Sequence, residues 1–219
     1  MTDERIRELA RDLEPVRRIP RLRAVGAGVV ASWVLVVLAD WLAGGWTPRA
    51  ASDSAWTSPS YLAALAGLAL VAFGATSAAL ASSVPGRAAA VRLGLRVSAL
   101  GVALALAGWI LGVAAGGHDH GGEDLGSILG CATRALGIGV IPVTLACAFV
   151  AYAALRRASL TAALALAGGV ALGAAAVHVS CPSNSPLHQL VAHTFAPAAA
   201  VVLLTAPLAL LMGRWARRG

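Results

Sequence analysis

Residues 156–181 read RRASLTAALALAGGVALGAAAVHVSC. Two arginines are followed by an uncharged, largely aliphatic stretch over 160–180, and His178 and Cys181 lie at its far end. About twenty apolar residues are what a helix needs to cross the roughly 30 Å hydrocarbon core of a bilayer. This segment is therefore predicted to be a transmembrane helix, with basic residues at one end and a thiol and an imidazole at the other.

The same pattern recurs along the chain. Of its 219 residues, 58% are hydrophobic and only 12% charged, whereas about a quarter of residues are charged in soluble domains. The other apolar stretches cover about 25–44, 61–83, 93–115, 135–155 and 189–212. The sequence thus predicts an all-α membrane protein: a six-transmembrane-helix bundle over 25–213, with a charged tail over 1–24 and a short tail over 214–219. Small residues spaced by four, at Gly108, Gly112 and Gly116 and at Gly169 and Gly173, are typical of close helix contacts in lipid.

The arginines predict the orientation. Six spans place both termini on one side, and fifteen of the seventeen basic residues then fall on that side. They are Arg5, Arg7, Arg11, Arg17, Arg18, Arg21, Arg23, Arg87, Arg92, Arg96, Arg156, Arg157, Arg214, Arg217 and Arg218, and only Arg49 and Arg134 fall on the other. By the positive-inside rule both termini are predicted to be cytoplasmic. Every basic residue is arginine, which favours a high-GC bacterial source and hence a cell inner membrane. The net charge of +7 is attributed to the arginines that orient the protein in the membrane. No direct nucleic-acid binding is therefore expected.

The N-terminal tail has no signal-peptide character, because it is long and rich in acids. Its apolar residues recur at helical spacing: Ile6, Leu9, Leu13 and Val16. Pro15 and Pro20 end the pattern. The tail is predicted to be a short cytoplasmic amphipathic segment, which needs a partner or the membrane surface because so short a helix is marginal alone in water.

The outer face, opposite the arginines, is predicted to gather the metal-binding side chains. They are His118, His120, His178, His188, His193, Cys131 and Cys181. The two cysteines, one just before the fourth span and one at the end of the fifth, are open to three interpretations: packed thiols, a disulfide or metal ligands. Cys147, in mid-span, is predicted to be packing only. The HDHGGED run over 118–124 is open to two interpretations, a polar loop and a metal site.

Three ionisable side chains at the ends of spans need partners. His178 and His193 are interpreted either as sensing residues or as interhelical hydrogen-bond donors. Asp40, near the outer end of the first span, is expected to pair with Arg134 or a histidine.

Most enzyme and transport functions are disfavoured. The chain has no Ser-His-Asp arrangement, phosphate-binding loop or HExxH motif, so we expect no enzyme. The middle of the spans is almost wholly Ala, Val, Leu and Gly, whereas a transporter places polar groups there. A thiol oxidoreductase needs a CxxC or a second cysteine pair, which this chain lacks.

The chain resembles the NrsF family of bacterial membrane-bound anti-sigma factors, which are negative regulators of extracytoplasmic-function sigma factors. The likeness spans nearly the whole length. It rests on the tail LARDLEPVRRIPRLR, the VPGR turn after the second span, Cys131, Pro142, His178, Cys181, Pro186, His188 and His193.

This resemblance implies that Ile6, Leu9, Leu13, Pro15 and Val16 belong to a sigma-binding segment, and that Cys131 and Cys181 are the sensing pair. Metal ions, oxidants and light-generated singlet oxygen remain open as the stimulus. No cofactor is required, and a transition metal at the periplasmic face is a candidate. A small metal-handling membrane protein or transporter is the alternative.

Overall fold

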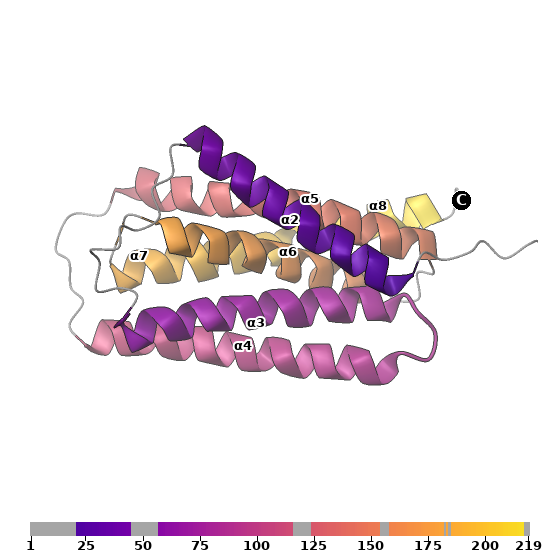
Figure 1. Ribbon diagram of the computed structural model, residues 1–219, viewed down its shortest axis with the longest axis horizontal. Coiled ribbons are helices and arrows are strands. Elements are labelled where there is room, and N and C mark those ends of the chain that lie inside the picture. The colour runs from indigo at the N-terminus through magenta and orange to yellow at the C-terminus, as the bar shows by residue number, and fades with distance from the viewer. Residues whose placement is uncertain are drawn as a thin grey trace, which may run out of the picture.

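The computed structural model describes residues 21–44, 57–115, 124–153, 158–181, 183 and 185–216. The long helices in these ranges are α2 (Leu22–Gly44), α3 (Pro59–Ser82), α4 (Ala88–Ala114), α5 (Leu125–Ala153), α6 (Ala158–Ser180) and α8 (Ala196–Ala216) (Figure 1). A short helix, α7 (Pro186–Leu190), and a π-helical turn, η2 (Val191–Phe195), lead into α8. Six segments are long and apolar enough to cross a membrane. The predicted all-α, six-helix membrane architecture is confirmed.

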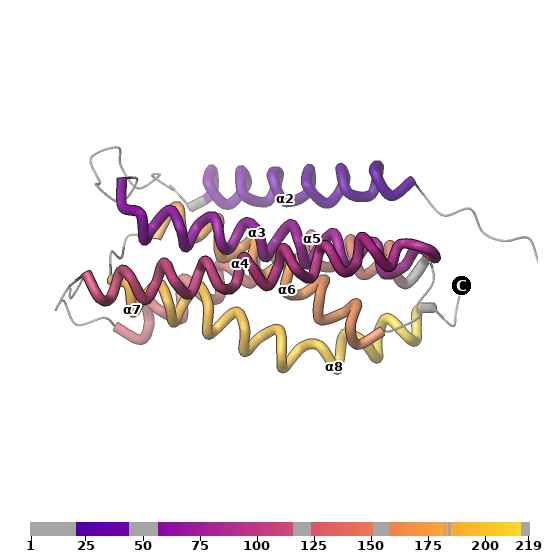
Figure 2. The backbone as a smooth tube through the Cα atoms, turned by 90° about the horizontal axis from the view of Figure 1, so that it is seen from below, coloured from indigo at the N-terminus to yellow at the C-terminus, as the bar shows by residue number. Residues whose placement is uncertain are grey.

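The bundle is organised around α6. In its apolar window 72% of residues are buried, the highest share among the six spans. It packs against α3, α5 and α8, while α3 and α4 form a tight antiparallel pair. By contrast α2 is peripheral, with 6% of its window buried, and packs mainly against α5. Figure 2 shows α2 running along the outside of the other helices.

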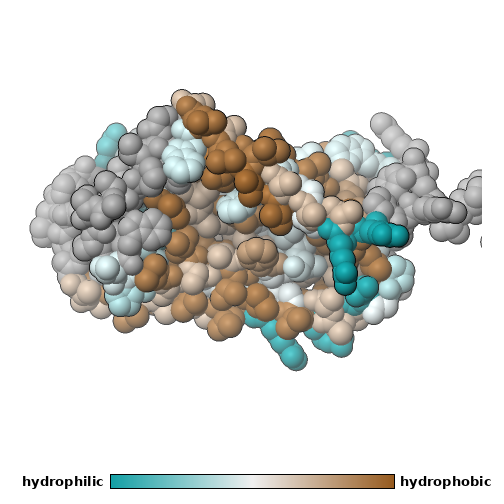
Figure 3. Space-filling model, in the orientation of Figure 1, coloured by the Kyte–Doolittle hydropathy of each residue, from teal (hydrophilic) through white to brown (hydrophobic). Residues whose placement is uncertain are grey.

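The face of the bundle seen in Figure 3 is largely apolar over its middle. Leu42, Val202 and Leu203 are 86%, 75% and 73% exposed. Soluble monomers rarely expose contiguous apolar surface of this kind, whereas hydrocarbon solvates it at no cost. The structure is that of a multi-pass membrane protein surrounded by lipid.

Most of the arginines among the described residues lie at one end of the bundle. Arg21 and Arg23 lie at the start of α2, Arg87 and Arg92 at the turn between α3 and α4 and the first turns of α4, and Arg214 in the last turns of α8. These three places meet at the same end in Figure 1. The opposite end carries the start of α5 and the end of α6.

The fourth span begins earlier than predicted. Hydropathy placed its start at 135, but α5 begins at Leu125. The carbonyl of Asp124 accepts hydrogen bonds from the N–H groups of Ser127 (3.0 Å) and Ile128 (3.4 Å), which starts the helix. Its first turns are glycine-rich and only moderately apolar, so a hydropathy average misses them. Cys131 therefore lies within α5, and the prediction that it precedes the helix is wrong.

Several predicted features lie outside the described residues. These are the tail over 1–20, with the sigma-binding residues Ile6, Leu9, Leu13, Pro15 and Val16, and the segment over 116–123, with His118 and His120. The amphipathic segment and the HDHGGED interpretations thus remain predictions.

Asp40 has the partner that the sequence required. The guanidinium of Arg134 donates from Nε to both carboxylate oxygens, at 3.0 Å each, and from a terminal nitrogen at 2.8 Å. Both side chains are about one-third exposed, at 29% and 33%. This bidentate pair joins α2 to α5, the helix against which α2 mainly packs.

Small residues let α5 and α6 approach closely. A Cβ on Gly169 would lie 2.8 Å from the carbonyl oxygen of Gly139, and one on Gly173 would collide with the carbonyl of Ala135. The predicted contact at Gly169 and Gly173 is confirmed. Because the helices are antiparallel, this seam brings the beginning of α5 beside the end of α6.

The other predicted glycine seam is confirmed in part. A Cβ on Gly108 would lie 2.6 Å from the carbonyl oxygen of Ser60 on α3, and one on Gly112 would only touch Pro186 at 3.4 Å. Gly116 lies outside the described residues.

Candidate metal centre

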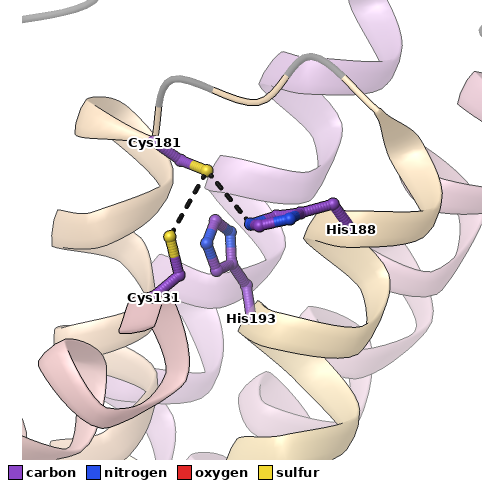
Figure 4. Close-up of side chains that lie close together, drawn as sticks. All are labelled: Cys131, Cys181, His188 and His193. Carbon is purple, nitrogen blue, oxygen red and sulfur yellow. Dashed lines mark hydrogen bonds between the residues drawn. The ribbon is translucent and has the colours of Figure 1, made fainter. Parts of the chain in front are cut away.

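Four side chains converge at the end of the bundle opposite the arginines. They are Cys131, Cys181, His188 and His193, and one ligand atom of each lies within 4.8 Å of those of the other three (Figure 4). Cys131 comes from the second turn of α5, Cys181 follows the last residue of α6, His188 belongs to α7, and His193 belongs to η2. Four separate elements therefore contribute one ligand each.

Local hydrogen bonds position Cys181 and His188. The N–H of Cys181 donates to the carbonyl of Val177 at 2.7 Å, which extends α6 by one residue. The hydroxyl of Ser185 caps α7 by accepting from the N–H of His188 at 3.3 Å. The side-chain amide of Gln189 donates to the carbonyl of Ser183 at 2.8 Å and ties α7 to the preceding loop.

The π-helical turn brings His193 to the same side as His188. In a regular α-helix, residues five apart are rotated by about 140° from one another, so these two side chains would diverge. In η2 the bonding shifts to five residues, as shown by the N–H of Ala196 donating to the carbonyl of Val191. Pro197 follows and has no N–H for the α-helical bond to the carbonyl of His193. A π-turn of this kind often marks a functional site.

Two of the distances between the donor atoms match those between the ligands of a tetrahedral metal ion, and all four donor atoms lie within 4.8 Å of one another. With zinc–sulfur and zinc–nitrogen bonds of about 2.3 and 2.0–2.1 Å, two sulfur ligands lie about 3.8 Å apart and a sulfur and a nitrogen about 3.5 Å apart. The sulfurs of Cys131 and Cys181 are 3.7 Å apart, and the sulfur of Cys181 lies 3.5 Å from Nε2 of His188. Both cysteines are free thiols, since a disulfide requires about 2.05 Å. The arrangement fits a Cys2His2 site.

Charge and burial also suit a divalent ion. Cys181, His188 and His193 are at most 1% exposed, and Cys131 is half-buried. Burying an isolated charge is costly. The charges of two thiolates and a divalent cation sum to zero, however, and neutral imidazoles add no charge. A thiophilic d10 ion such as Zn²⁺ prefers this donor set.

His178 lies beside the four ligands rather than among them. Its Nδ1 is 3.4 Å from Nδ1 of His193, and its Nε2 is 3.4 Å from the carbonyl oxygen of Tyr61. Its ring stacks on that of Tyr61, with centroids 4.3 Å apart, and meets the edge of Trp109 at 5.1 Å. The interhelical hydrogen-bonding interpretation of this residue agrees with these contacts.

Some of these residues were predictable from the sequence and others were not. The predicted topology placed Cys131, Cys181, His188 and His193 on one face, and the structure brings them together. The sequence did not single out Tyr61, Trp109 or Thr194, whose hydroxyl accepts from the indole N–H of Trp109 at 2.9 Å. The sequence feature that could have pointed to Tyr61 and Trp109 is the presence of a polar aromatic residue inside an apolar span. Cys147 is buried in an apolar core cluster, as expected of a packing residue.

Comparison of the chain with family models, curated proteins and solved structures finds no match. The fold and the site together define its class: a multi-pass α-helical membrane protein with a candidate Cys2His2 metal centre at one end of its bundle.

Proposed function

We propose that this protein is a bacterial inner-membrane anti-sigma factor of the NrsF type. It holds an extracytoplasmic-function sigma factor through residues 1–20 and releases it when a thiophilic divalent metal binds at Cys131, Cys181, His188 and His193. The observation that carries the proposal is the convergence of these four donors at the end of the bundle opposite the arginines. With the arginine end in the cytoplasm, the donors face the periplasm and the tail faces the sigma factor.

The proposed signal passes from the metal site to the tail through α5 and α2. Cys131 and Arg134 are three residues apart on α5, so they are neighbours on one side of the helix. Arg134 is paired with Asp40 on α2, and α2 is the helix that follows the tail. Metal ligation would pull the start of α5 toward α6 and η2 and displace this ion pair. A switch of this kind needs only a local ligation event and an element with two positions.

Deleting residues 1–20 is expected to abolish sigma binding without preventing membrane insertion. The tail carries the apolar stripe Ile6, Leu9 and Leu13, which suits helix-in-groove binding, while the six spans are intact. The measurement is co-purification of the extracytoplasmic-function sigma factors of the same bacterium with full-length and truncated protein. Repression by a truncated protein that still inserts into the membrane would contradict the proposal.

Neutralising Asp40 is expected to uncouple metal binding from sigma release. In Asp40→Asn the carboxylate that holds Arg134 is lost, while all four metal donors stay in place. Zn²⁺ should therefore bind as in the wild type but no longer release the bound sigma factor from protein in nanodiscs. The matched control is the charge-reversed pair Asp40→Arg with Arg134→Asp, which should restore release. Normal zinc-triggered release in Asp40→Asn alone would rule out this route.

The metal site also favours a second candidate, a metal-handling protein or transporter. The two functions differ in one measurement, the uptake of Zn²⁺ into proteoliposomes. An anti-sigma factor binds the ion at one end of the bundle and transports none, whereas a transporter takes up Zn²⁺ and loses this uptake when Cys131 or His193 is replaced.

A further inference from the structure

The metal-binding atom of His193 depends on its tautomer, which the neighbouring side chains determine. A neutral imidazole carries one N–H and one lone pair, and only the nitrogen with the lone pair binds a metal. His193 turns its Nδ1 toward His178, at 3.4 Å. Two imidazole nitrogens at this distance need one donor and one acceptor. The position of a single proton therefore decides which nitrogen of His193 is available to a metal.

A main-chain carbonyl fixes the tautomer of His178. Its Nε2 lies 3.4 Å from the carbonyl oxygen of Tyr61, and a carbonyl oxygen only accepts hydrogen bonds. With its proton on Nε2, His178 donates to this carbonyl, and the lone pair of its neutral ring then lies on Nδ1.

We propose that His178 is a positioning residue that holds His193 with its proton on Nδ1, so that Nε2 carries the lone pair that binds the metal. His193 donates from Nδ1 to His178, and His178 donates from Nε2 to the carbonyl of Tyr61. Outer-sphere partners of this kind orient metal-binding histidines and raise their basicity. The effect of His178 on metal affinity rests on the proposed metal-binding function, but the arrangement of the protons on the two histidines requires no metal.

Contacts from two other helices keep His178 in place. The hydroxyl of Tyr61 donates to the main-chain carbonyl of His178 at 3.3 Å, so the two residues are joined by a reciprocal pair of hydrogen bonds. The rings of Trp109 and His178 are nearly perpendicular and in contact, and the indole N–H of Trp109 donates to the hydroxyl of Thr194, the neighbour of His193. His178 thereby links α6 to α3 and α4. These two helices contribute no ligand to the metal site, but they support it through His178.

The test measures both zinc affinity and the tautomer of His193. His178→Phe keeps an aromatic ring but has no acceptor, and His178→Asn restores an acceptor near the position of Nδ1. Zn²⁺ affinity, determined by competition with a chromophoric chelator in detergent, should fall about 10–100-fold in His178→Phe and recover in part in His178→Asn. Nitrogen-15 NMR of labelled histidine should show His193 protonated on Nδ1 in the metal-free wild type and lose this single tautomer in His178→Phe.

Tyr61→Phe is the matched control. It retains the stacked ring and the main-chain carbonyl that accepts from His178, so the tautomer of His193 should not change. Wild-type affinity and a wild-type tautomer in His178→Phe would overturn the inference. If the wild type binds no Zn²⁺, the proposed function fails, and the NMR of the metal-free protein still decides the role of His178. If His178→Phe does not fold, His178→Asn and the wild-type spectrum decide it.

Discussion

Replacing Cys131 and Cys181 with serine is expected to abolish tight binding of Zn²⁺. Each thiolate supplies both a bond to the ion and one of the two negative charges that balance it. Because loss of an outer-sphere partner alone costs about 10–100-fold in affinity, loss of a direct ligand should cost more than that. The sulfur atoms lie 3.7 Å apart, close to the spacing of two sulfur ligands on one tetrahedral ion.

The measurement is a chelator competition with purified protein, supported by the tetrahedral absorption of bound Co²⁺. Cys147→Ala is the matched control, because Cys147 is a buried thiol on the same helix as Cys131 but belongs to an apolar core cluster. It should bind Zn²⁺ like the wild type. Unchanged affinity in Cys131→Ser with Cys181→Ser would refute the metal centre, and spontaneous disulfide formation in the wild type would favour a redox sensor instead.

Adding a single methyl group at Gly173 is expected to destabilise the bundle and disperse the site. In Gly173→Ala the new Cβ meets the main-chain carbonyl of Ala135, which cannot move without shifting α5. Overpacking of a buried contact costs about 1–3 kcal/mol, and here α5 and α6 must separate. Since Cys131 lies in the second turn of α5 and Cys181 follows the last residue of α6, the sulfur–sulfur distance should grow. Zn²⁺ affinity should then fall together with the thermal stability.

Gly137→Ala provides the comparison on the facing helix. No heavy atom lies within 4 Å of a Cβ built at Gly137, and alanine is the better helix former, so stability should be unchanged or slightly raised. Thermal unfolding in detergent and zinc competition measure both effects. Equal melting temperatures for Gly173→Ala and Gly137→Ala would show that the close approach of α5 and α6 does not hold the site together.

The sequence predicted the helices well because the bilayer imposes a simple rule on them. Every backbone N–H and C=O group within lipid must form its hydrogen bond inside the protein, so an uncharged stretch such as 160–180 is expected to form a helix. In the structure, α6 covers Ala158–Ser180. Where the pattern was less apolar, as over 125–134, hydropathy placed the start of the helix too late. The pairing of Asp40 with Arg134 was also predictable, because a carboxylate at the end of a span needs a cation.

What the sequence determined by itself was therefore the number of spans, the end of the bundle to which the arginines go, and the face that carries the thiols and imidazoles. The tertiary structure decided which of those side chains meet. Glycine contacts between α5 and α6 set the distance between Cys131 and Cys181, a π-turn before Pro197 rotated His193 toward His188, and a carbonyl on α3 oriented His178. These features arise from contacts between residues far apart in the chain and from a local change of helical period, and neither leaves a signal in hydropathy or spacing.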